Sequence, residues 1–431
     1  MVRFHLDNLK EETCHGNERT AQIQQGWGEL PEPAIEKIFS YLNRRDQNAM
    51  SKVCTRWASE YNAPGLWKNF IFYLPEQSRY TEGVCPAVST ARRNAEMFRH
   101  VEIICKTRNP FLNKTRVQQL KLFLMALERA PQIIKIKVVG LGKLFSYLSS
   151  TLRLEILDNM SRFFRSINTV QEVILCEINI SKYEAIQILN SIFHSDNNKI
   201  KYVTIRKVVE ELEVPSLNGL YEQNINIFSE NILTITSIEF DYSKLFEDLL
   251  NSLYQKIESG NFHFDKKQHK LKNLKIYHED NRQFSGILPD TWNGIKTAFP
   301  QLNVNIKINI NNMERVFEHI LVKNIPLRGL EMTFDKRSNI QGRQLINKLE
   351  DCNYENLEDL KINWFPSINI FAVRPLKQLL CTYTHLRRFH LVAECNSGLI
   401  ENMILAFFED HRNDLLEYSI YLKEKLYFES V

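Results

Sequence analysis

The sequence predicts an α/β protein in which a short helical module precedes a solenoid of about eleven strand–helix units. Two observations lead to this prediction. Between Trp27 and Phe72 the apolar residues recur at helical spacing. From Phe98 onward one apolar triplet recurs at regular intervals, with helical patterns between its copies. With 431 residues, the chain is long enough for more than one domain.

A first helix is predicted from an apolar stripe that begins just after two prolines. Pro31 and Pro33 stand where a helix starts, and a missing backbone N–H costs little at that position. The stripe occupies positions i, i+3, i+4 and i+7 of one helix face. Its members are Ile35, Ile38, Phe39 and Leu42.

A second helix and a third apolar segment are predicted next. Asp46 is a suitable N-cap for the second helix, and Pro64 with Gly65 ends it. The apolar positions of that helix are Ala49, Met50, Val53, Cys54, Trp57 and Tyr61, and the third segment holds Leu66, Trp67 and Phe70. Because a module this small buries little surface, part of the apolar set should face a partner. The alternative is a helical cap that packs on the following domain.

The order and spacing of these residues resemble an F-box. The matching positions are Leu30-Pro31, Ile35, Ile38-Phe39, Tyr41-Leu42, Asp46, Val53-Cys54, Trp57, Pro64 and Leu66-Trp67. The family usually has leucine after the aspartate, where this chain has Gln47. The resemblance implies docking on the Skp-type adaptor, and through it on a cullin, of a ubiquitin ligase. The adaptor-binding residues that it implies are Leu30, Pro31, Ile35, Ile38, Phe39, Leu42, Val53, Cys54, Trp57, Leu66 and Trp67.

Composition and charge narrow the class of protein further. Lys+Arg 55 against Asp+Glu 51 gives a net charge of +4, too balanced to favour nucleic acid or a membrane surface as a partner. The eight cysteines are scattered without a CxxC pair, and no apolar run approaches the length that crosses a bilayer. Residues 1–25 are polar and lack the apolar core of a signal peptide. We therefore expect the protein in the cytoplasm and/or nucleus.

Four regions follow from these patterns: a flexible tail over 1–25, the F-box over 26–72, a connector over 73–97 and the solenoid over 98–431. The repeated triplet reads apolar-x-x-apolar-x-apolar, and its eleven copies start 28 to 37 residues apart. The copies are Phe98/Val101/Ile103, Ile133/Ile136/Val138, Val170/Val173/Leu175, Ile200/Val203/Ile205, Ile235/Ile238/Phe240, Leu271/Leu274/Ile276, Phe299/Leu302/Val304, Leu327/Leu330/Met332, Leu357/Leu360/Ile362, Leu386/Phe389/Leu391 and Leu415/Tyr418/Ile420. Each triplet ends in the alternation of a half-buried strand.

Helical patterns separate the triplets. They cover 117–127, 144–164, 183–193, 245–257, 313–322, 342–349, 376–383 and 399–408. A strand and a helix that alternate at near-constant spacing form a solenoid, because each unit buries its apolar edge only against its neighbours.

The triplet resembles the strand of a leucine-rich repeat, which implies a horseshoe with the strands on its concave face. Two departures are visible. The family usually has Asn or Cys three residues after the last apolar position, where this chain has residues such as Lys106, Ile178 and Glu279. The first units also exceed the usual length of about 20–29 residues, which leaves their regularity open. The alternative is an irregular α/β domain.

No catalytic or metal-binding motif is present, so we expect a non-catalytic protein without cofactor or metal. The strand positions between the buried ones should line the concave face. Their charges are mixed and form no arginine cluster of the kind that reads phosphate, which favours recognition of protein or peptide. The positions chosen as target-binding are Lys275, Tyr277, Asn303, Asn305, Lys361, Asn363, Arg388 and His390; Glu331 and Asp359 lie on the same face.

The combined hypothesis is a substrate receptor of a Skp–cullin–F-box ubiquitin ligase. The F-box would dock on the adaptor, while the solenoid would hold a protein target for ubiquitination by raising its effective concentration. Two alternatives remain open. One is a scaffold that binds the adaptor without directing degradation, and the other is an enzyme with an unrecognised site.

Overall fold

The fold is that of a computed structural model of the full chain. It describes residues 27–74, 83–105, 113–194, 199–209, 232–260, 270–279, 285–310, 313–334, 347–349, 351–352, 354–368, 382–383, 385–395, 402 and 417–424. The chain divides into two compact units, Met1–Trp67 and Lys68–Val431. We call them the helical unit and the repeat unit.

The described part of the helical unit, residues 27–67, contains four short α-helices. They are α1 (Glu32–Tyr41), α2 (Arg44–Met50), α3 (Thr55–Tyr61) and α4 (Pro64–Trp67), preceded by the 3-10 turn η1 (Trp27–Glu29). The start of α1 is as predicted, with Pro33 in its first turn. The single helix predicted after Asp46 is wrong, since it is divided into α2 and α3. The N-cap is Asn43, whose side chain accepts from the backbone N–H groups of Arg45 and Asp46.

The repeat unit is built on one parallel sheet of twelve strands, each hydrogen-bonded to the strands before and after it in the chain. The strands are β1 (Asn69–Tyr73), β2 (His100–Ile104), β3 (Lys135–Val139), β4 (Glu172–Cys176), β5 (Tyr202–Arg206), β6 (Ser237–Asp241), β7 (Asn273–His278), β8 (Asn303–Ile310), β9 (Leu327–Phe334), β10 (Asp359–Ile368), β11 (Arg388–Cys395) and β12 (Glu417–Glu424). A strand order that equals the chain order is the topology of a solenoid. This confirms the predicted fold class.

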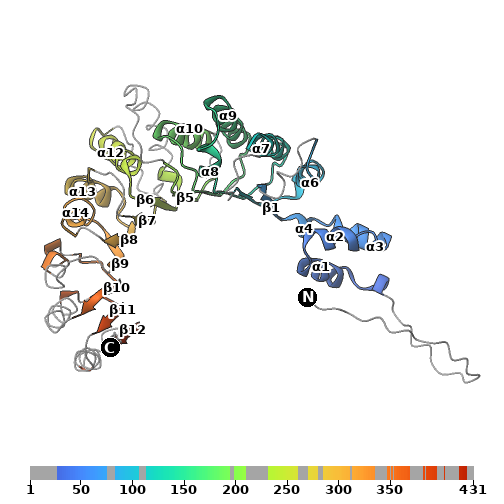
Figure 1. The fold of residues 1–431 in the computed structure, drawn as a ribbon. Coiled ribbons are helices and arrows are strands. Elements are labelled where there is room, and N and C mark those ends of the chain that lie inside the picture. The colour runs from blue at the N-terminus through green and yellow to red at the C-terminus, as the bar shows by residue number, and fades with distance from the viewer. Residues whose placement is uncertain are drawn as a thin grey trace, which may run out of the picture. The chain divides into compact units, whose positions relative to one another are not determined.

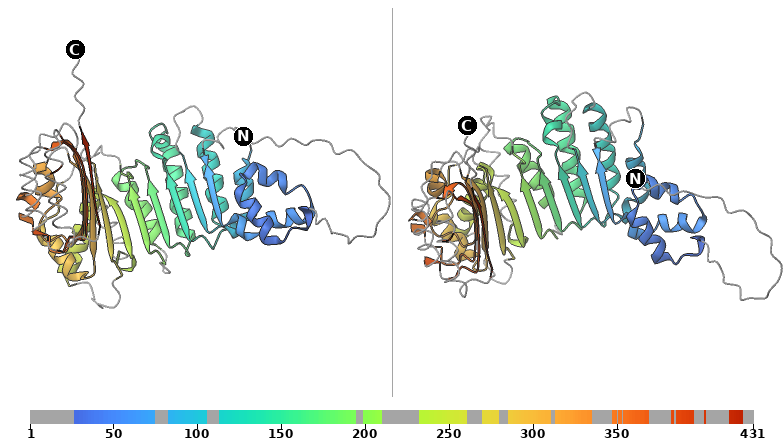
Figure 2. Two further views of the ribbon diagram at one scale, coloured as in Figure 1. Left: turned by 90° about the horizontal axis from the view of Figure 1, so that it is seen from below. Right: turned by 60° about the horizontal axis from the view of Figure 1, so that its bottom comes forward.

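Helices cover one face of this sheet, and the strands form the inner face of its curve (Figures 1 and 2). The helices and 3-10 turns are α6 (Pro86–Asn94), η2 (Ala95–Met97), α7 (Asn113–Leu127), α8 (Gly142–Phe145), α9 (Ser150–Ser166), α10 (Lys182–Phe193), η4 (Ile232–Thr234), α12 (Lys244–Glu258), α13 (Pro289–Ala298) and α14 (Met313–His319). Helix α13 was not predicted. The predicted helices over 342–349, 376–383 and 399–408 lie largely outside the described residues. No described helix has both the length and the apolar character to cross a membrane.

The strand register tests the predicted triplets one by one. The first six triplets place their last two residues in register with one another, and so do the last four. Between the two groups the register shifts at β8, where Ile306 pairs with both Ile276 and Leu330. The seventh is wrong by two residues, because Val304 pairs with Leu274 and Ile306 pairs with Ile276. Leu302 is also buried, so the sequence offered two apolar frames and the choice between them was incorrect.

The early units are regular. Strands β2 to β6 have five residues each, and no register shift interrupts their pairing. The turn after β4 is fixed by backbone bonds where the family uses an Asn side chain. The N–H groups of Glu177 and Ile178 donate to the carbonyls of Arg206 and Lys207, while the Ile178 side chain is fully buried.

Strand β1 was not predicted as a strand. Its Phe70 and Phe72 are buried and stand in register with Val101 and Ile103 of β2, so Phe70 belongs to the repeat sheet. Helix α6, within the predicted connector over 73–97, follows β1 as the helix of a further strand–helix unit. The sheet therefore has one strand more than the eleven triplets predicted.

Candidate functional site

The aromatic residues of the F-box pattern form the core of the helical unit. Phe39 meets Trp57 edge to face with ring centroids 5.6 Å apart, and Tyr61 meets Trp67 in the same way at 5.2 Å. The indole N–H of Trp67 donates to the Tyr61 carbonyl at 2.7 Å. The indole N–H of Trp57 donates to the carbonyl of Trp27 at 3.1 Å. These contacts hold the short helices together.

Gln47, which departs from the family pattern, lies inside this core. Its side chain is 6% exposed, and its Nε2 donates to the Phe39 carbonyl at 2.7 Å. Its Oε1 accepts from Arg44 at 2.8 Å, and the Arg44 guanidinium also covers the ring of Trp67. Both polar ends of the buried amide are thus satisfied. The departure alters the interior of the unit, where a hydrogen-bonded amide takes the place of an apolar contact.

The predicted adaptor-binding residues separate into a buried and an accessible group. Ile35, Phe39, Trp57, Leu66 and Trp67 are buried. Leu30, Ile38, Leu42 and Cys54 are half-buried, while Pro31 and Val53 are exposed. In this structure the side chains of the buried group fix the helices, and adaptor contact by these residues stays a prediction. A sequence pattern does not separate the two groups, because both are apolar.

Two accessible aromatic residues were missed. Trp27 is 75% exposed and Tyr41 is 77% exposed, values close to the 66% of Val53. Tyr41 follows Ile38 by three residues and therefore lies on the same side of α1. Helical spacing alone could thus have identified Tyr41 as a candidate. We call Trp27, Pro31, Tyr41 and Val53 the apolar surface of the helical unit.

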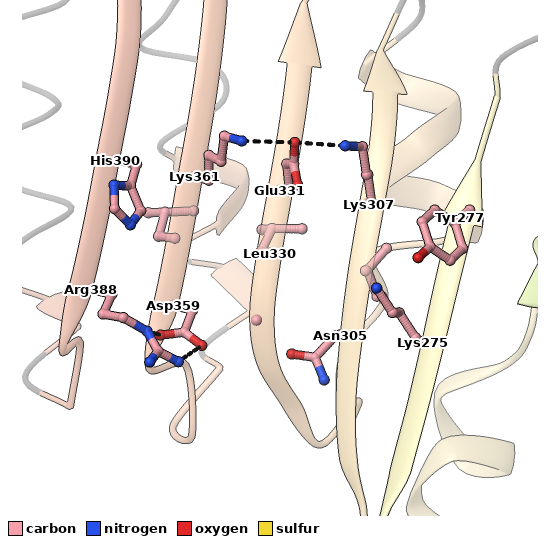
Figure 3. A pocket seen from close by; sticks show the side chains of 13 residues that line it. Lys275, Tyr277, Asn305, Lys307, Leu330, Glu331, Asp359, Lys361, Arg388 and His390 are labelled. Carbon is pink, nitrogen blue, oxygen red and sulfur yellow. Dashed lines mark hydrogen bonds and ion pairs between the residues drawn. The ribbon is translucent and has the colours of Figure 1, made fainter. Parts of the chain in front are cut away.

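A second candidate site lies on the inner face of strands β7 to β11. The register aligns two rows of side chains across these strands (Figure 3). The first row is Tyr277, Lys307, Glu331, Lys361 and His390, and the second row is Lys275, Asn305, Gly329, Asp359 and Arg388. Together they line a groove of about 550 Å³, which we call the inner groove.

Glu331 lies at the centre of the first row and holds two lysines. Its Oε1 is 2.8 Å from the Nζ of Lys307 and 3.3 Å from the Nζ of Lys361. Burial alone would raise the pKa of Glu331, but the hydrogen bonds and positive charges of the two lysines outweigh it and hold the pKa below its usual value. In the second row, Arg388 forms a paired bond with both carboxylate oxygens of Asp359.

The β7 end of the groove is aromatic. The Arg206 guanidinium lies 3.6 Å from the centroid of the Tyr277 ring, and the Nζ of Lys275 lies 5.1 Å from it. Lys275 also approaches Glu239 at 3.8 Å. Burial lowers the pKa of Lys275, but its bond to Tyr277 and the charge of Glu239 outweigh this, so the pKa is raised. Lys275 is thus a fixed cation.

Six of the eight predicted target-binding residues line the inner groove: Lys275, Tyr277, Asn305, Lys361, Arg388 and His390. Asn303 and Asn363 lie on β8 and β10 outside this lining, and Asn363 donates to the Thr333 hydroxyl at 3.1 Å. Lys307 was missed because the incorrect frame on β8 ended that strand at Asn305.

The described residues offer little for covalent or metal chemistry. Among them, no three His, Cys, Asp or Glu side chains come together as metal ligands would. The cysteines that the structure describes are free thiols. Burial raises the pKa of Cys105 to about 12 and also raises that of Cys85, which suits packed side chains better than nucleophiles.

Comparison with known proteins supports the assignment of the helical unit. The family model of F-box-like domains matches residues 27–73. F-box/LRR-repeat protein 21 of Bos taurus is 38% identical over 68 residues, which are 15% of this chain and 16% of that protein. The Mus musculus protein of the same name is 40% identical over 52 residues, 12% of each chain. The matches thus span less than a fifth of the length of either relative.

Solved structures give weaker matches. The complex of TLR13 with ssRNA13 aligns with a TM-score of 0.31 and 10% identity, covering 85% of this chain and 38% of that chain. A Bacteroides fragilis protein aligns with a TM-score of 0.24 and 9% identity, covering 75% and 66%. The chain contains an F-box-like domain at residues 27–73, and a leucine-rich-repeat-like solenoid of parallel strands and helices follows it.

Proposed function

We propose that this protein is a non-catalytic substrate receptor of a Skp–cullin–F-box ubiquitin ligase. The helical unit docks on the Skp-type adaptor, and the repeat unit binds a protein target. The mechanism is positional, since a bound target stays near the charged ubiquitin carrier and its effective concentration there is high. This role belongs to the cytoplasm and nucleus.

The observation that supports the proposal best is the apolar surface on an F-box-like domain. Trp27, Tyr41 and Val53 expose most of their apolar area to solvent, while the core of the same unit is closed and hydrogen-bonded. Large apolar side chains left exposed beside a closed core favour a partner surface, and aromatic anchors that become buried usually dominate the energy of such contacts.

The docking half is tested with purified full chain and adaptor by isothermal titration calorimetry. Tyr41→Ala and Val53→Ala should each weaken adaptor binding at least tenfold, or about 1.4 kcal/mol. Leu154→Ala is the matched control, because Leu154 is 60% exposed on α9 of the repeat unit. Phe39→Ala should instead lower the melting temperature, since Phe39 is fully buried. Equal adaptor affinity of Val53→Ala and Leu154→Ala would refute the docking assignment.

The ligase half is tested in cells with the full chain. Wild-type protein should recover both adaptor and cullin, and the Tyr41→Ala/Val53→Ala variant should recover neither. Proteins captured by both forms should turn over faster with wild type than with the variant. Recovery of adaptor without cullin, or equal half-lives, would contradict the receptor hypothesis and favour a scaffold that does not direct degradation.

A further inference from the structure

Charges on the first strands of the inner face are balanced pair by pair. On β3, Lys137 lies 2.6 Å from Glu102 of β2, and Lys135 lies 2.7 Å from Glu172 of β4. Each lysine therefore has its own carboxylate on a neighbouring strand. Cross-strand pairs of this kind stabilise a sheet modestly and leave no net charge for a ligand.

In the inner groove, the charged side chains are not balanced one carboxylate to one cation. Its lining has four cationic side chains, Lys275, Lys307, Lys361 and Arg388, but only two carboxylates, Glu331 and Asp359. Arg388 is paired with Asp359, and Lys275 approaches Glu239 of β6. The excess positive charge is thus located at Glu331, whose single carboxylate is shared by two lysines on β8 and β10.

The groove also has space beside this charge. Gly329 occupies the middle of the second row, and a Cβ atom there would lie 2.4 Å from Oδ1 of Asn305. The Asn305 amide therefore lies where a side chain of residue 329 would begin, and the room for a ligand is the groove volume of about 550 Å³. Five strands spaced about 4.8 Å apart span roughly 19 Å, the length of about six residues of extended chain.

We infer that the inner groove binds an extended peptide segment with one or two acidic side chains. The inference rests on the proposed function, because such a segment would belong to the target protein. An acidic side chain at the first row meets Lys307 and Lys361, with Tyr277 and His390 on either side. Asn305 and Asp359 present acceptors for backbone N–H groups of the peptide.

A single carboxylate fits this groove better than a nucleic acid. A nucleic-acid strand requires several cations in succession for its phosphates, and the groove has an excess of only about one charge beside two carboxylates. Glu331 already occupies the position that a ligand carboxylate would take between the two lysines. It therefore competes with the ligand and keeps Lys307 and Lys361 close together until the ligand binds.

Because Glu331 competes with the ligand, removing its charge and removing the lysine charges should change peptide affinity in opposite directions. Lys307→Gln with Lys361→Gln should weaken peptide binding, whereas Glu331→Gln should strengthen it. All three side chains are accessible on the inner face, so the variants should melt with the wild type. The control is Lys135→Gln with Lys137→Gln, two lysines of the same face whose partners are outside the groove.

The experiment is selection of a random heptapeptide phage library on the immobilised full chain. Wild type and the control should enrich peptides containing Asp or Glu, and the Lys307→Gln/Lys361→Gln variant should not. The best peptide, made synthetically and measured by fluorescence polarisation, should bind the double variant about tenfold more weakly. It should bind Glu331→Gln about twofold to fivefold more tightly.

The outcomes separate this inference from the proposed function. Acidic enrichment that survives in the double variant, or a Glu331→Gln variant that binds no tighter, overturns the inference. So does a dT20 oligonucleotide that binds through the same lysines more tightly than the peptide. Adaptor affinity is measured on the same samples. A wild-type protein that does not bind the adaptor would overturn the docking proposal, while the peptide measurements would still test the inner groove.

Discussion

Two neighbouring residues of β10 test the repeat unit most directly, because their side chains point to opposite faces. Leu360 is fully buried and stands in register between Leu330 of β9 and Phe389 of β11. Lys361 faces the inner groove, with 43% of its side chain exposed. Leu360→Ala should lower the free energy of unfolding by about 3–5 kcal/mol, because strands on both sides limit collapse of the cavity.

Lys361→Ala removes only a surface ion pair. Such pairs contribute below about 1 kcal/mol, and Glu331 keeps its bond to Lys307 at 2.8 Å. We therefore expect a loss near 0.5 kcal/mol or less, roughly a tenth of the effect at Leu360. Circular dichroism melting of both variants and wild type measures the difference. Leu360→Ala should lower the melting temperature by roughly 5 °C or more, and Lys361→Ala by about 1 °C.

Similar losses for the two variants would refute the register of the sheet. A one-residue slip would exchange the faces of every side chain on the strand, so Lys361 would then become the buried residue. A small loss at both positions would instead mean that β10 lies outside the cooperative core of the repeats. Either result would also remove the basis for the inner groove, whose rows depend on this register.

Two further predictions concern Gly329 and β1. Gly329→Ala should change stability by no more than about 1 kcal/mol, since Asn305 can turn away, yet weaken binding of the selected heptapeptide severalfold; melting and fluorescence polarisation check both parts. The fragment 68–431 should elute as a monomer in size-exclusion chromatography, whereas the fragment 74–431 should aggregate. It lacks β1, so Phe123 and the edge of β2 are uncovered. A monomeric 74–431 would contradict the role assigned to β1.

The sequence contained the signal for β1, but a stronger pattern obscured it. Trp67, Phe70 and Phe72 form one more apolar-x-x-apolar-x-apolar triplet, 31 residues before Phe98. Trp67 also closes the F-box pattern, so the segment was assigned wholly to the helical module. In the structure the chain uses Trp67 in the first unit and Phe70 with Phe72 in the second. A fragment of the repeats should therefore begin at Lys68.

The fold class and most of the groove residues were predictable because both follow from the alternation of buried and exposed residues along a strand. Strand alternation fixes which residues are buried, and the remaining positions define the inner face. The frame of β8 could not be chosen from the sequence, because Leu302 and Val304 are both apolar and both buried. That error removed Lys307 from the predicted site. In the helical unit, the pattern identified apolar residues correctly but could not tell core from surface, since Phe39 and Val53 satisfy it equally.

The inner face is where this sequence is least constrained by folding. Apart from His278, the buried side chains of β7 to β10 are apolar, such as Leu274, Ile306 and Leu360, because the core requires it. The positions between them need only remain soluble, and one carboxylate for each lysine meets that need on β2 to β4. Two lysines on Glu331 therefore exceed what the fold requires. A charge arrangement that adds little stability and differs from its neighbours is better explained by binding, and Glu331→Gln separates the two explanations in one measurement.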